Sequence, residues 1–240
     1  MLKICYLYPD ILNQHGNWGN VAALLKRCVW RKIDVDLIKI NPGDPVDFAK
    51  VDIVYLGTGS EQARKAVFDD LMPRRDILQT AIEQGMVMLA AGSGCHLLGM
   101  YRLTEEGHRV SSLGLISFYT RLTNTFLVGD CVIGMQLAGN EVRIAGFENH
   151  REHVVRSEGL APLGNILYGH GNNGKDKTEG FRYKNVFGTN MASLLPKNPM
   201  LTDLLLGAAL QNKKSPVKFT TLDNSLEERA LDVMLKRLLD

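Results

Sequence analysis

Short, almost wholly apolar segments alternate with longer amphipathic ones along the first part of the chain, and no other feature constrains the fold as much. Residues 21–30 and 61–84 carry apolar side chains at helical spacing, with Pro73 at an expected break. Strands that are apolar on both faces and joined by helices predict a doubly wound α/β fold with a mostly parallel sheet. The expected strands are residues 3–8, 33–40, 51–56 and 87–91.

From Gly107 onward the pattern changes to short β-rich segments separated by turns, which predict added β hairpins or a sheet edge within the same domain. A helix is expected over 198–210, and Pro216 belongs to the break that follows it. We therefore expect one domain over 1–212 and a C-terminal linker and helix over 213–240. The expected hairpin segments are 125–133, 141–145 and 180–187.

The C-terminal helix, expected over 222–239, has a defined apolar face. This face consists of Leu226, Ala230, Val233, Met234 and Leu238. It either packs on its own domain or contacts a partner protein.

Composition and charge exclude several classes of protein. The net charge of +2 is too small to indicate binding to nucleic acid or to an anionic membrane. The chain has no apolar run of about eighteen residues and no signal-peptide pattern, so we expect a cytoplasmic protein without a membrane span. The four cysteines form no C-x-x-C pair and are expected to be free thiols. His150 and His153 alone are too few ligands for a metal site, and no cofactor is expected.

We expect chemistry at the turn after the 87–91 strand, because open parallel sheets bind ligands at the carboxyl ends of their strands. A nucleophile elbow needs small residues two positions before and two positions after its centre, since the backbone folds tightly there. An elbow centred on Gly92 meets this need with Ala90 and Gly94. Glycine, however, has no side chain that could attack a substrate.

Other interpretations of this turn stay open. A plain strand-to-helix turn with close backbone packing has the same pattern. An elbow centred on Ser93 would place Cys95 two positions later, and one centred on Cys95 would have to accommodate the bulky Leu97. Cys95 itself is typical of a small packing residue.

A set of short motifs recurs in a fixed order between about Leu2 and Leu210. In this order the motifs resemble the glutaminase (GatD-type) subunit of lipid II isoglutaminyl synthase, within the cobyric acid synthase glutaminase group. The resemblance implies a flavodoxin-like class I glutamine amidotransferase fold. The motifs are residues 7–10, 19–20 and 24–31, the glycine-rich loop 57–62, the Phe-Glu-Asn-His segment within 146–150, and residues 171–180 and 194–199.

Active members of the class are similar in mechanism. An elbow cysteine attacks the side-chain amide of glutamine, a histidine takes the thiol proton, and backbone N–H groups hold the oxyanion. The resemblance implies a Mur-ligase-like partner that uses the ammonia to amidate a peptidoglycan precursor, and glutamine or a related small molecule as ligand. It places Gly57, Thr58, Gly59, Ser93 and His96 at the substrate-binding surface.

The chain departs from the family at both positions that carry the chemistry. The family pattern Cys-Gly-Gly-aromatic-Gln-Leu-Leu-Gly lies on residues 92–99, which puts Gly92 at the cysteine and His96 at the glutamine. The family histidine lies in a Gly-Thr-Tyr-Leu-His-Gly-like segment. Residues 188–194 stand there, one residue shorter, with Ala192 at the histidine. Loss of both groups predicts a chain that no longer hydrolyses glutamine by this route.

Three hypotheses about function remain. The first is a binding, scaffolding or regulatory subunit without glutaminase activity. The second is an active amidotransferase or hydrolase with a relocated nucleophile, Cys95 or Ser93. The third is a small-molecule sensor that uses the former glutamine pocket. Arg121 is either the clamp for a ligand carboxylate or an ordinary surface arginine.

Overall fold

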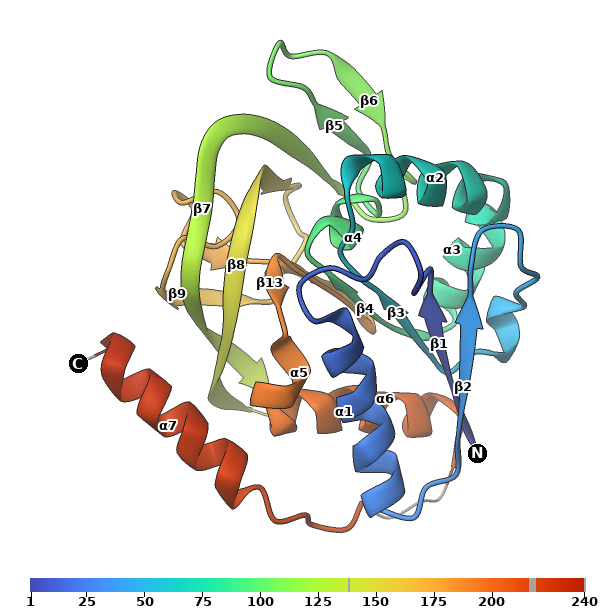
Figure 1. Ribbon diagram of the computed structural model, residues 1–240, viewed down its shortest axis with the longest axis vertical. Coiled ribbons are helices and arrows are strands. Elements are labelled where there is room, and N and C mark those ends of the chain that lie inside the picture. The colour runs from blue at the N-terminus through green and yellow to red at the C-terminus, as the bar shows by residue number, and fades with distance from the viewer. Residues whose placement is uncertain (138, 216–218, 240) are drawn as a thin grey trace.

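A mostly parallel sheet forms the centre of the structure (Figure 1). Its strands are β1 (Leu2–Leu7), β2 (Val35–Ile40), β3 (Ile53–Leu56), β4 (Val87–Ala91), β11 (Phe181–Tyr183) and β12 (Val186–Thr189). They lie in the order β11-β12-β4-β3-β1-β2, with β11 antiparallel to β12 and the other neighbours parallel. The computed structural model describes residues 1–137, 139–215 and 219–239, and Pro216 lies outside the described residues.

Helices cover both faces of this sheet, as the doubly wound pattern predicts. In β1 the side chains of Ile4 and Tyr6 join the core cluster that includes α1 (Asn17–Trp30) and α6 (Pro199–Asn212). Those of Cys5 and Leu7 join the cluster that includes α2 (Glu61–Leu71) and α3 (Arg75–Glu83). The expected break at Pro73 falls in a short 3-10 turn, η2 (Met72–Arg74), between α2 and α3. One face carries α1 (Asn17–Trp30), α5 (Leu194–Lys197) and α6 (Pro199–Asn212), and the other carries η1 (Phe48–Lys50), α2 (Glu61–Leu71) and α3 (Arg75–Glu83).

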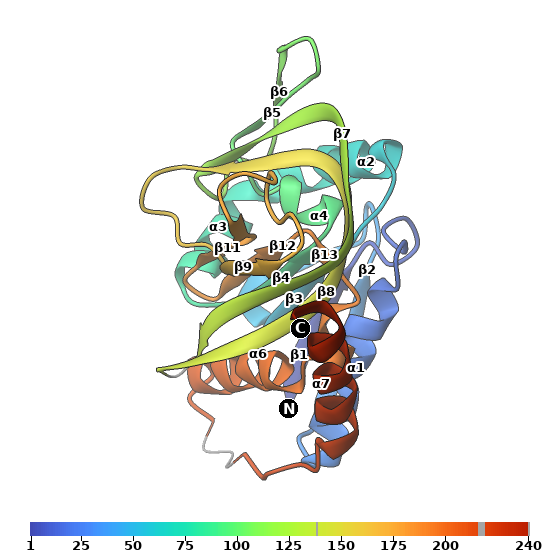
Figure 2. The same cartoon turned by 90° about the vertical axis from the view of Figure 1, so that its left-hand side faces the viewer.

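A second, mixed sheet is built on one long hairpin, which Figure 2 shows as a bent ribbon along the molecule. Its strands β7 (Phe118–Leu137) and β8 (Asn140–Arg156) are longer than the segments expected from the sequence. Their pairing shifts register between Leu122 and Leu127, and the ribbon bends toward the central sheet. The shorter strands are β5 (Tyr101–Leu103), β6 (Arg109–Ser111), β9 (Gly164–Tyr168), β10 (Thr178–Glu179) and β13 (Met191–Ala192).

The C-terminal helix α7 (Ser225–Leu239) packs on the outside of this hairpin, at the left edge of Figure 1. Leu235 is buried against Val132 and Ala145. The apolar face expected from the sequence is partly wrong, because Leu226 and Val233 are 70% and 68% exposed. The stripe that packs is Leu231, Met234, Leu235 and Leu238.

None of the helices in the described part of the chain is long and apolar enough to cross a membrane. The division at residue 212 coincides with the end of α6, and the independence of the segment after it stays a prediction.

Candidate functional site

The turn after β4 has the backbone of an elbow, and its centre is Gly92. Gly92 has φ 54° and ψ −135°, a backbone conformation that residues other than glycine rarely adopt. Its N–H donates to the carbonyl of Thr189 at the end of β12, at 2.7 Å. Ser93 and Cys95 belong to the short helix α4 (Ser93–His96), so the strained position is not theirs.

Close backbone approach explains why residues around the elbow must be small. A Cβ added at Gly94 would collide with the carbonyl oxygen of Gly57. A Cβ added at Gly57 would collide with the side-chain amide of Asn17, which donates to the Thr58 carbonyl at 2.9 Å. The glycine-rich turn after β3 is thus packed directly against the elbow, where the resemblance places a turn that helps to bind the oxyanion.

The place of a nucleophile is filled from the neighbouring turn. The Oγ1 atom of Thr58 lies where a Cβ at residue 92 would stand, and it donates to the Ala91 carbonyl at 3.1 Å. Ser93 is engaged in the same way, since its hydroxyl donates to the Gly59 carbonyl at 2.9 Å and accepts from the Gly59 N–H at 3.1 Å. Both hydroxyls therefore hold the two turns together.

The position expected for the catalytic histidine carries a methyl group. Ala192 lies in β13, where it pairs with Phe147 of β8. It faces the same cavity as Gly92, so the topology still brings the two positions together. Neither residue can transfer a proton or attack an amide.

A cavity of about 570 Å³ lies over the elbow. Six of the residues singled out in the sequence line it: Thr58, Gly59, Gly92, Ser93, His96 and Ala192. Gly57, Cys95 and Arg121 are not among the described lining residues. Gly57 lies beneath Asn17, Cys95 is 1% exposed in the core, and Arg121 is exposed on β7.

A buried polar cluster forms one wall of this cavity, with His96 at its centre. His96 Nε2 lies 2.8 Å from Asn190 Oδ1, and Nδ1 lies 3.5 Å from Glu152 Oε2. Glu152 also accepts from Arg64 at 2.7 Å and from Thr120 Oγ1 at 2.5 Å. The Asn190 amide nitrogen donates to Asn172, so its oxygen faces His96 and Nε2 must be the donor.

The charges of His96 and Glu152 support each other. Burial alone would lower the pKa of His96, but the neighbouring Cys95 and Glu152 outweigh burial and raise it to about 10. Burial likewise opposes the charge on Glu152, yet His96 and Arg64 hold the pKa of Glu152 well below its usual range. Each of the two groups thus favours the charged form of the other across the 3.5 Å between His96 Nδ1 and Glu152 Oε2.

Sequence reasoning missed Arg64, Glu152 and Asn190. A usable signal was present in β8, where Glu148, His150 and Glu152 alternate and all point into the protein. Charged residues at period two on the buried face of a strand require buried partners. The alternation therefore marks a polar site without revealing which distant residues complete it.

Two further buried carboxylates hold the loops behind the cavity. Glu148 accepts from the backbone N–H groups of His170 and Gly171 at 2.7 and 2.8 Å. Glu179 accepts from the backbone N–H of Asn190 at 2.7 Å, and so positions the partner of His96. The motifs around 146–150 and 171–180 thus act in the architecture of the site.

The described part of the chain offers no cluster of three or more His, Cys, Asp or Glu side chains that could hold a metal ion. The cavity is suited to binding a small molecule. It combines polar side chains, a strained backbone turn and enough volume for a small molecule.

The geometry defines a protein of the class I glutamine amidotransferase fold, and solved structures agree with this class. A PurLQS structure from Thermotoga maritima has a TM-score of 0.56 at 13% identity and covers 88% of this chain and 96% of that chain. The glutaminase domain of Trypanosoma brucei CTPS also has a TM-score of 0.56, at 9% identity, and covers 92% of this chain and 96% of its own. At such low identity these likenesses show the flavodoxin-like fold alone.

Sequence comparison then gives the family. The chain belongs to the CobB/CobQ-like glutamine amidotransferase family, whose domain matches residues 3–198. It is 35% identical over 237 residues to the GatD subunit of lipid II isoglutaminyl synthase (glutamine-hydrolyzing) from Staphylococcus aureus, covering 98% of this chain and 96% of the relative. The corresponding subunit from Streptococcus pneumoniae is 31% identical over 244 aligned positions, covering 98% and 92%.

Proposed function

We propose that this chain is a GatD-type subunit related to lipid II amidation that does not hydrolyse glutamine and instead acts as a binding or regulatory partner of a Mur-ligase-like protein. One observation carries the proposal. The elbow is intact in its backbone, but Gly92 supplies no nucleophile and Thr58 fills the space where one would begin.

The chemistry of glutamine hydrolysis supports this view. A nucleophile and a base must act as a unit, and removal of the nucleophile leaves only residual catalysis. In this chain the nucleophile position is Gly92 and the base position is Ala192. His96, which also lines the cavity, has its Nε2 bonded to Asn190 and its Nδ1 3.5 Å from Glu152, so it is not placed as a free base.

Retention of the cavity supports a role in binding. The cavity keeps about 570 Å³ and a polar wall that costs energy to bury, which a purely structural remnant would not require. Glutamine or a related small molecule is the ligand we propose for it. Titration calorimetry with glutamine and glutamate tests this point, and absence of heat at millimolar ligand would argue against a retained pocket.

The relatives support a partner protein. Both curated relatives are described as subunits of a synthase, and this chain aligns with them over 98% of its length. A Mur-ligase-like protein encoded beside this chain should co-purify with it. The four free, buried cysteines support a reducing, cytoplasmic location for the complex.

The decisive experiment measures ammonia release from glutamine. The purified chain and its complex with the partner are assayed beside an active class I glutaminase as a positive control. We expect no release above the rate in the absence of protein. Turnover at the rate of the active control would show that the proposed loss of activity is wrong.

The alternative is an active enzyme with Cys95 as a relocated nucleophile, favoured by the proximity of Cys95 to His96. Its burial speaks against it, since Cys95 is 1% exposed. Native thiol labelling separates the two views, because all four cysteines are buried and burial raises the pKa of Cys5 to about 12 and of Cys28 to about 11. We expect slow labelling until the chain unfolds. Fast labelling and glutamine turnover, both lost in Cys95→Ala, would favour the alternative.

A further inference from the structure

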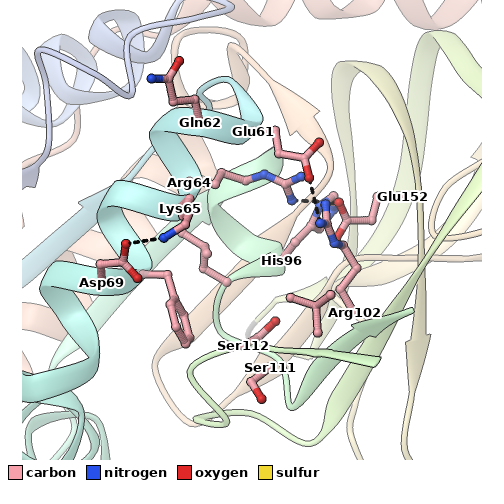
Figure 3. A pocket seen from close by; sticks show the side chains of 13 residues that line it. Glu61, Gln62, Arg64, Lys65, Asp69, His96, Arg102, Ser111, Ser112 and Glu152 are labelled. Atoms are coloured by element: carbon pink, nitrogen blue, oxygen red, sulfur yellow. Dashed lines mark hydrogen bonds and ion pairs between the residues drawn. The ribbon is translucent and has the colours of Figure 1, made fainter. Parts of the chain in front are cut away.

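A second cavity lies on the other side of the polar cluster, between α2 and the β5–β6 hairpin (Figure 3). Its volume is about 560 Å³, within the range of small-molecule pockets. Phe68 of α2, Leu97 and Val110 of β6 supply apolar walls. None of the functions considered for the elbow uses this space.

Charged groups gather at one end of this cavity. Arg64, Arg102 and His96 meet the carboxylates of Glu61 and Glu152 there, as Figure 3 shows. Two guanidinium groups and the imidazole of His96 therefore face two carboxylates. His96 Nδ1 is buried and has no hydrogen-bond partner among the described residues, since Glu152 Oε2 is 3.5 Å away.

The pair at the mouth of the cavity is easy to open. Arg102 donates to Glu61 at 2.7 Å, but the Glu61 side chain is 66% exposed while that of Arg102 is 17% exposed. Exposed ion pairs contribute little to stability, so Glu61 can turn into solvent at small cost. Arg102 would then be available to an incoming anion.

We infer that this cavity binds a small amphiphilic oxyanion, a carboxylate or phosphate monoester on an apolar body. The oxyanion binds at the end formed by Arg102, Arg64 and His96, where it accepts hydrogen bonds from the donors that Glu61 and Glu152 now use. The apolar body packs against Phe68, Leu97 and Val110, out of water. This site does not depend on the elbow or on any reaction of glutamine.

Occupancy of the second cavity would reach the candidate site through a shared wall. Glu61, Arg64, His96 and Glu152 line both cavities. An anion beside Arg64 and His96 competes with Glu152 for both cations, so it alters the wall that the elbow cavity uses. The cluster is thus placed to couple the two ligands.

Calorimetry with four probes of equal chain length tests the inference: octanoate, octyl phosphate, octan-1-ol and octylamine. We expect saturable one-site binding of octanoate or octyl phosphate, at least about tenfold tighter than that of octanol, and no binding of octylamine. Which of the two anions binds more tightly identifies the head group. Equal affinity for octanol and octanoate, or no binding of either anion at millimolar concentration, overturns the inference.

Two variants locate the site on the molecule. Arg102→Gln should weaken octanoate binding about tenfold, and Val110→Glu, at a position 43% exposed, should abolish it by placing a negative charge in the wall. Arg143→Gln, at an exposed position on β8 away from the cavity, is the matched control and should bind as the parent does. Unchanged affinity in both cavity variants, with their thermal unfolding unaltered, shows that the anion binds elsewhere.

Discussion

Thr58 Oγ1 lies where it would collide with a Cβ at Gly92, so a side chain at position 92 requires the Thr58 hydroxyl to move. Thr58 Cβ would lie 3.2 Å from the added atom, which is a tight contact even after the hydroxyl has turned. The hydroxyl also bonds the Ala91 carbonyl and so links the glycine-rich turn to the elbow. A cysteine at position 92 would therefore require Thr58 to shift as well.

Gly92→Ala tests this relationship through stability. The left-handed conformation alone costs a side chain about 1–3 kcal/mol, and the collision with Thr58 adds to it. Gly43→Ala is the control, because Gly43 has φ 89° with nothing within 4 Å of an added Cβ. In urea unfolding we expect Gly92→Ala to lose at least about 1 kcal/mol more than Gly43→Ala.

A double variant assigns that extra loss to Thr58. Without Oγ1, the alanine methyl at 92 meets less resistance. The pair Thr58→Ala with Gly92→Ala should therefore be more stable than the sum of the single losses by about 1 kcal/mol. Strict additivity of the two losses would mean that Thr58 does not limit the elbow.

Glu152→Gln should be among the most destabilising single substitutions outside the apolar core. It leaves Arg64 and His96 buried without their shared counter-charge, which typically costs about 3–5 kcal/mol. Since the pKa of Glu152 is lowered in the folded state, its contribution is present above the unfolded value of 4.5 and is lost as pH falls further. Urea unfolding at neutral pH and at pH about 3 should show the difference between parent and variant shrinking in acid.

The matched control for this substitution lies on the same strand. Glu141→Gln, at an exposed position of β8, should change stability by less than about 0.5 kcal/mol. A loss at Glu152 no larger than at Glu141 would mean that the cluster does not hold charges in the folded protein.

The centre of the mostly parallel sheet could be predicted from sequence because the inner strands β3 and β4 are buried on both faces. The segment 87–91 reads as a strand without reference to any partner, and β4 has the same bounds. The backbone of the elbow could also be predicted, since Ala90, Gly92 and Gly94 report the close approach of neighbouring chain segments.

The polar cluster could not be assembled in this way, because its members His96, Asn190, Glu152, Arg64 and Thr120 come from five separate segments. His96 and Asn190 are 94 positions apart, and Thr120 and Glu152 meet across the pairing of β7 with β8, a hairpin whose length the sequence did not reveal. The prediction of the packed face of α7 was partly wrong for a related reason. A helix with apolar residues on more than one side is oriented by the surface beneath it, and β7–β8 selects Leu235 rather than Val233.

Leu235→Ala should release α7 from the hairpin. Leu235 packs against Val132 and Ala145 in a small cluster, so its truncation should cost about 2 kcal/mol of docking free energy. Hydrogen exchange of the α7 amides should then be about thirtyfold faster while that of the central sheet stays unchanged. Val233→Ala, on the exposed side of the helix, is the control, and equal exchange in the two variants would place the docking face elsewhere.

Glu179 should make the protein less stable as pH rises toward neutrality. Burial raises the pKa of Glu179 to about 7, although hydrogen bonds from Asn190 and Thr189 limit the rise. The unfolded chain releases this proton near pH 4.5 and the folded chain keeps it to about pH 7, so between these values the folded state binds the extra proton and loses stability with rising pH.

Glu179→Gln removes this proton and keeps an amide oxygen for the Asn190 N–H. The free energy of unfolding of the variant should therefore rise relative to that of the parent between pH 5 and 8, by up to about 3 kcal/mol. Glu158→Gln, at an exposed position, should show no such gain. A variant that instead loses stability relative to the parent as pH rises would mean that Glu179 is an ionised carboxylate in the folded protein throughout this range.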